Sequence, residues 1–126
     1  MLEHARLACQ QGIMVMAARR QRRVRPVDAA VGRLLALASK GVQPIRMARE
    51  IEIIVAEWLG DPEAEPSEVK ERLDELREQI IAGVTDAEEQ LSDTDVSEPA
   101  AVKLASATLA ALVATRDAAI RALTAL

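Results

Sequence analysis

Residues 66–91 read PSEVKERLDELREQIIAGVTDAEEQL, and the spacing of their apolar side chains decides the fold. These side chains recur at intervals of three or four, which places them on one face of an α-helix. They are Val69, Leu73, Leu76, Ile80 and Val84, with Ala87 and Leu91 as a possible continuation. The segment therefore predicts a long amphipathic helix with one face in a core, and we expect Ser67 to cap its start.

The same periodicity extends outward from this segment in both directions. It predicts further helices over residues 2–23, 27–40, 44–59 and 99–126, separated by proline and glycine. Half of the 126 residues are hydrophobic, yet Trp58 is the only aromatic one, so the core must consist of aliphatic side chains and suits helix-on-helix packing. We expect a single all-α domain, a bundle of about five helices with a long C-terminal helix.

The predicted helix over residues 99–126 has two faces that could be buried. One side carries an apolar stripe interrupted by Arg116, which we expect to pair with Glu50, Glu57 or an acidic residue of another subunit. The other side carries alanines, which either reflect helix propensity or admit a second helix at close range. The stripe consists of Val102, Ala105, Leu109, Leu112, Val113, Ile120 and Leu123, and the alanines are Ala100, Ala107, Ala110, Ala111, Ala114, Ala118 and Ala125.

Residues 40–51, KGVQPIRMAREI, resemble the opening of the helix-turn-helix of resolvases and transposases. In those families a turn glycine follows and a recognition helix comes after it. Glu52 stands where that glycine is expected, so one unbroken amphipathic helix over residues 44–59 is the prediction.

Charge divides the chain unevenly. Residues 1–60 form a basic half with ten Lys and Arg against five Asp and Glu, whereas residues 61–98 form an acidic half with three against fourteen. The Ala-rich helix over residues 99–126 completes the domain. Such asymmetry is typical of chains that bind nucleic acid or a charged partner, and it also permits head-to-tail self-association.

Five arginines within seven positions form the basic patch: Arg19, Arg20, Arg22, Arg23 and Arg25. They could contact the phosphates of DNA, although no aromatic residue is nearby to stack on bases. Alternatively the arginines are simply solvated, bind the acidic segment of their own chain, or bind that of a neighbour. The candidate acidic partner surface consists of Glu68, Glu71, Glu75 and Glu78, which lie opposite the apolar seam of their helix and are predicted to be solvated.

Several functions are not expected. The chain has one histidine, His4, and one cysteine, Cys9, and it lacks a glycine-rich phosphate loop and a nucleophile motif, so we expect no enzyme, cofactor, metal site or small-molecule substrate. No apolar run approaches the roughly 20 residues that span a membrane. A single cysteine excludes an intrachain disulfide, and a cytoplasmic location is the expectation.

The sequence thus predicts a non-enzymatic, self-associating helical adaptor. Its basic N-terminal patch and acidic central segment would meet the surfaces of partners, most simply other copies of the chain. The alternative is a small DNA-binding protein of the phage or mobile-element type, which would contact the DNA backbone through residues 19–25.

Overall fold

The computed structural model describes residues 24–126, and this part of the chain forms four helices and no strand. They are α2 (Pro26–Ser39), α3 (Pro44–Leu59), α4 (Pro66–Asp93) and α5 (Pro99–Ala125). The predicted all-α bundle with a long C-terminal helix is confirmed. The count of about five was one more than the four described helices, because the first predicted helix, over residues 2–23, lies outside the described residues.

Proline defines where each helix begins. Pro26, Pro44, Pro66 and Pro99 each occupy the first helical position, where the missing N–H is not needed and the fixed φ already suits a helix. None of the four helices has a side-chain hydrogen bond at its N-cap. The predicted cap by Ser67 is therefore wrong, since α4 already begins at Pro66 and its N-cap is Glu65, two residues before Ser67.

The predicted stop after α2 is confirmed in detail. Gly41 has φ of +74°, the left-handed conformation that glycine adopts without steric cost. The N–H of Gly41 donates to the carbonyl of Ala38 (3.0 Å) and that of Val42 to Leu37 (3.4 Å), which is the Schellman pattern.

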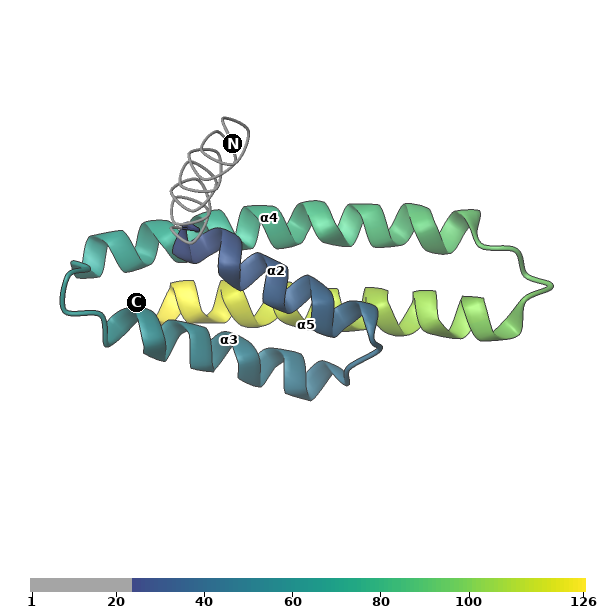
Figure 1. Cartoon of the computed structure of the whole chain (residues 1–126), viewed down its shortest axis with the longest axis horizontal. Helices are drawn as coiled ribbons and strands as arrows, with labels where there is room; N and C mark the ends of the chain where they lie inside the picture. Colours follow the sequence, from purple (N-terminus) through teal and green to yellow (C-terminus); the bar gives the residue numbers. More distant parts are fainter. Residues whose placement is uncertain (1–23) are drawn as a thin grey trace, which may run out of the picture.

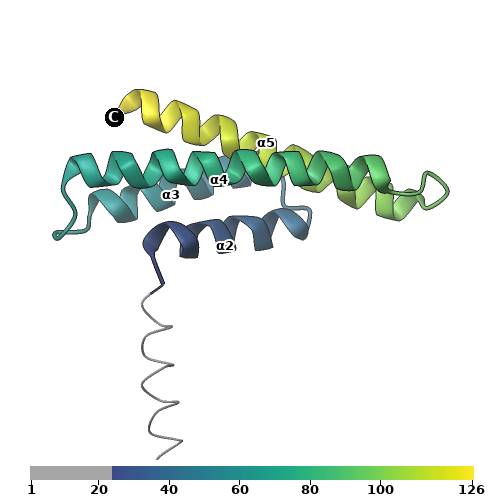
Figure 2. The ribbon, with the colours of Figure 1, turned by 90° about the horizontal axis from the view of Figure 1, so that it is seen from above.

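The helices alternate in direction along the chain, as Figure 1 shows. α4 and α5 form a long antiparallel hairpin, and α5 contacts all three other helices, most extensively α4 and α3. α2 runs in the same direction as α4 and contacts it. In both views the hairpin end around residues 94–98 projects beyond α2 and α3 (Figures 1 and 2).

The core forms where the apolar faces of the four helices meet. In α4 the predicted seam from Val69 to Val84 is buried and continues to Ala87. α3 is unbroken, as predicted, and buries Met47, Ile51, Ile54 and Trp58. Leu35 of α2 and Leu59 of α3 follow the same apolar spacing but are exposed, by 38% and 53%.

The buried face of α5 differs from the predicted stripe. Its buried residues are Ala111, Leu112, Thr115, Ala118 and Ala119, whereas Ile120 is 42% exposed. The reason is that α5 lies between α4 and α3 and also touches α2, so the sides of closest approach take the smallest side chains. The buried hydroxyl of Thr115 donates to the carbonyl of Ala111 in the same helix (2.7 Å).

Candidate functional site

Arg25 is the one residue of the predicted basic patch that the structure describes. It is the N-cap of α2, and its guanidinium donates a hydrogen bond to Oε1 of Glu75 on α4, with Asp28 3.8 Å away. The hydrogen bond from Arg25 to Glu75 is the main cause that raises the pKa of Arg25 above its ordinary value. One member of the basic patch thus contacts one member of the acidic surface within a single chain. Arg19, Arg20, Arg22 and Arg23 lie outside the described residues.

Of the four glutamates of the acidic surface, Glu68, Glu71 and Glu78 are exposed, whereas Glu75 is partly buried and faces α2. Glu75 bonds to Arg25, and Glu78 accepts a hydrogen bond from the adjacent Arg77 (2.9 Å). Glu68 and Glu71 are exposed and make no ion pair with any residue between 24 and 126. Two of the four predicted glutamates are therefore exposed without an ion pair among the described residues, and a cationic partner could contact them.

A second charged cluster joins α2 to α3, and sequence reasoning missed it. Arg33 donates from Nε and Nη2 to Oε2 of Glu50, at 3.1 and 2.7 Å, and its Nη1 lies 3.6 Å from Glu57. The hydrogen bond to Glu50 raises the pKa of Arg33 despite partial desolvation. Two acids seven residues apart on one face of α3 were the signal that could have pointed to a shared cation on a facing helix.

This cluster also corrects the prediction for Arg116. Glu50 and Glu57 are taken by Arg33, and Arg116 pairs instead with the adjacent Asp117, at 3.1 Å from Nη2 to Oδ1. Arg116 is 35% exposed, so it reaches solvent at the edge of the stripe and needs no buried partner.

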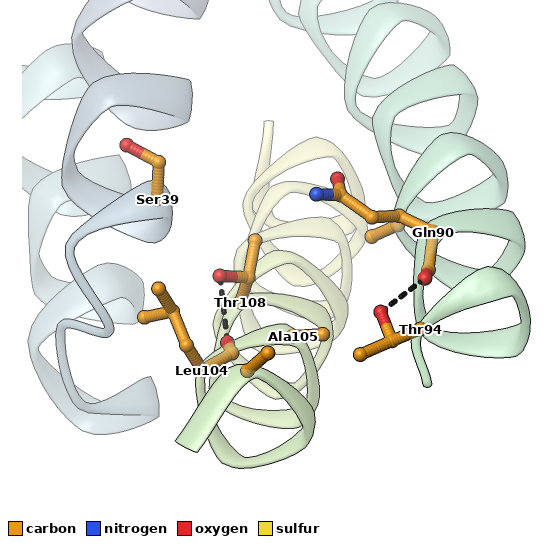
Figure 3. A pocket seen from close by; sticks show the side chains of 8 residues that line it. Ser39, Gln90, Thr94, Leu104, Ala105 and Thr108 are labelled. Atoms are coloured by element: carbon orange, nitrogen blue, oxygen red, sulfur yellow. Dashed lines mark hydrogen bonds between the residues drawn. The ribbon is translucent and has the colours of Figure 1, made fainter. Parts of the chain in front are cut away.

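A pocket of about 230 Å³ lies where the end of α2 meets the α4–α5 hairpin (Figure 3). Ser39 comes from α2, and the remaining lining residues come from the last turns of α4 and the first half of α5. They are Ala87, Gln90, Thr94, Ala101, Leu104, Ala105 and Thr108. The sequence did not point to this site, because small and polar residues at helical spacing are equally typical of a solvent-exposed helix face.

The described residues contain neither a metal-binding cluster nor a membrane-spanning helix. No group of three or more His, Cys, Asp and Glu side chains between residues 24 and 126 is arranged to hold a metal ion. Within the same range no helix is long and apolar enough to cross a membrane.

Comparisons with protein-family models, with curated proteins and with solved structures gave no match to this chain.

Proposed function

We propose that the protein is a non-enzymatic helical adaptor that acts in the cytoplasm and associates with itself through surfaces of opposite charge. The observation that carries the proposal is the Arg25–Glu75 ion pair, which joins the basic patch to the acidic surface where both side chains still reach solvent. The same pairing is open to the glutamates that have no partner among residues 24–126, Glu68 and Glu71. Contacts between exposed charges are individually weak and salt-dependent, so several must act together.

Light scattering at micromolar concentration and low salt tests the self-association. We expect a mass well above the 13.6 kDa of one chain, falling toward that value in high salt. Replacing Glu68, Glu71 and Glu78 by Gln should weaken the association. A matched control replaces three exposed glutamates elsewhere, Glu52, Glu63 and Glu98, and removes the same charge. A mass of one chain for the wild type at low salt would rule the proposal out.

Binding of the DNA backbone by the basic patch is the second candidate. The side chain of Arg25 remains 58% exposed even while it is paired, so its guanidinium can still meet a phosphate. Because each phosphate contact releases counterions, binding should weaken steeply with salt.

A mobility-shift assay with duplex DNA in low salt separates the two candidates. Changing Arg19, Arg20, Arg22, Arg23 and Arg25 to Gln should abolish the shift. The control changes five exposed cations elsewhere to Gln, namely Arg46, Arg49, Lys70, Lys103 and Arg121, and should keep most of it. If both variants lose binding equally, the contact is only a response to net charge. Absence of a wild-type shift in low salt would exclude DNA.

A further inference from the structure

The outward face of α3 carries apolar side chains that no other described helix covers. α3 lies at the edge of the four-helix arrangement (Figure 1). One side of this helix packs into the core, and the opposite side leaves Ile45 72% exposed and Leu59 53% exposed. Single exposed aliphatic side chains are common on protein surfaces, but these two share one helix face with an exposed alanine, Ala56, between them.

The spacing along this face is typical of a helix that packs against another helix. Five residues follow one another at intervals of four, three, four and three: Ile45, Arg49, Glu52, Ala56 and Leu59. Residues at the seam between two helices recur at these heptad intervals. All five are exposed, so no element of the described bundle occupies the seam.

The two charges at the centre of this seam have no partner within the described bundle. Arg49 and Glu52 are three positions apart, close enough to pair in a helix, yet neither makes an ion pair with any residue between 24 and 126. A surface that covers the seam must therefore be acidic opposite Arg49 and basic opposite Glu52. A second α3 that runs in the opposite direction meets both conditions.

A two-fold axis midway between Arg49 and Glu52 makes the face complementary to itself. Each Arg49 then lies opposite Glu52 of the second copy. Each Ile45 lies opposite Ala56 of the second copy, so that a large side chain meets a small one. Two α3 helices that ran in the same direction would instead place arginine opposite arginine and glutamate opposite glutamate. Charge therefore selects the antiparallel arrangement.

We propose that two copies of the protein form a dimer through antiparallel packing of their α3 helices, with Arg49 and Glu52 paired across the two-fold axis. This inference rests on the proposed self-association and deepens it, because it names an interface that uses neither the basic patch nor the acidic surface.

The size of the face sets the strength of this dimer. α3 has 16 residues, so it is about 24 Å long and about 10 Å wide. Its outward face is far smaller than the roughly 800 Å² that each partner buries in a standard interface. The dimer is therefore weak, and it forms at tens to hundreds of micromolar protein.

Charge reversal in the full chain tests the pairing. Arg49→Glu alone, or Glu52→Arg alone, places like charges opposite each other, so each should raise the dissociation constant at least about tenfold. The double variant restores opposite charges and should dimerise like the parent chain. A mixture of the two single variants should also dimerise, because each supplies the charges that the other lacks. Sedimentation equilibrium at tens to hundreds of micromolar protein measures these constants.

A second pair of variants tests the apolar part of the face. Ile45→Gln should weaken the dimer several-fold. The matched control Val96→Gln removes an aliphatic side chain that is 88% exposed between α4 and α5, and it should leave the dissociation constant unchanged. Circular dichroism checks that each variant keeps its helices.

All these variants and their parent also carry Gln in place of Glu68, Glu71 and Glu78, which weakens the association proposed above and lets the α3 dimer be measured alone. A parent chain that stays monomeric at hundreds of micromolar, or a double variant as weak as the single ones, would overturn the proposal. Opposite effects of the two single reversals would assign the face to a different charged surface, of the same copy or another, and would overturn it as well.

The two associations can fail separately. Association through the basic patch and the acidic surface is measured at micromolar protein in the unmodified chain, where the α3 dimer is largely dissociated. Loss of that association with the charge-reversal results intact would leave the α3 interface standing, and the reverse pattern would leave only the proposed function.

Discussion

Two glycines lie inside helices and have different surroundings. Gly32 in α2 is exposed, and a Cβ built there meets nothing within 4 Å. A Cβ at Gly83 in α4 would lie 3.3 Å from Cδ2 of Leu35 and 3.9 Å from Cδ1 of Leu112. Gly32 therefore costs helix stability without a packing reason, whereas Gly83 lets α2 approach α4 closely.

Alanine substitution at both positions tests this distinction. Gly32→Ala should raise the free energy of unfolding by about 0.5–1 kcal/mol, because alanine loses less conformational entropy in a helix. Gly83→Ala should gain less or nothing, since Leu35 must shift to admit the methyl group. Urea denaturation of both variants measures the difference, and a gain at Gly83 equal to that at Gly32 would show that α2 and α4 are not in close contact there.

Among the elements, α5 depends most on small side chains. Ala111 is fully buried where the helices approach, and the adjacent Ala110 is exposed. The alanines that suggested contact with a second helix therefore pack partly within the chain's own bundle. Their small size sets the distance between α5 and its neighbours.

A pair of leucine substitutions separates packing from helix propensity. Ala111→Leu should lower the free energy of unfolding by about 1–3 kcal/mol, because the larger side chain overpacks the core. Ala110→Leu makes the same chemical change in solvent and should stay within about 0.5 kcal/mol of the wild type. Thermal or urea unfolding of the two variants provides the comparison. Similar losses in both would mean that α5 is not seated as described.

The elements also differ in how well sequence predicts them. The faces of α3 and α4 could be assigned because large aliphatic residues alternate there with charged ones. The buried face of α5 could not be assigned, because alanine occurs both in cores and on exposed helix surfaces. The close approach of the neighbouring helices buries Ala111 and leaves Ile120 exposed. For the candidate site, sequence supplied the charges of Arg25 and Glu75 but not their contact, which depends on α2 and α4 running in parallel. The pocket is built from three helices and has no local signature.

In the molecule as a whole, the clustering of acidic residues at one end lowers the stability of a single copy. The last turn of α4 carries Asp93 and no basic residue, although the negative end of the helix dipole favours cations there. Glu89 lies three residues after Asp86 and four before Asp93, spacings at which like charges repel. One copy would be more stable with mixed charges at this end of α4.

Glu89→Lys tests this cost. The substitution converts two repulsive pairs into attractive ones and places a cation near the end of α4, so we expect stabilisation by about 1 kcal/mol at low salt. In 1 M salt most of the gain should vanish, because the Debye length falls to about 3 Å. Thermal unfolding at both salt concentrations is the measurement. An equal gain at high salt would point to helix propensity instead of charge.

The proline at the first position of each helix restricts how copies can associate. Hairpins of helices can open into one continuous helix and exchange arms between copies, but proline keeps the preceding residue out of helical geometry and clashes with the carbonyl four residues earlier. Pro44, Pro66 and Pro99 stand at all three junctions between the described helices. Fusion of neighbouring helices into one continuous helix is therefore strongly disfavoured along residues 24–126, and so is exchange of arms between copies by that route.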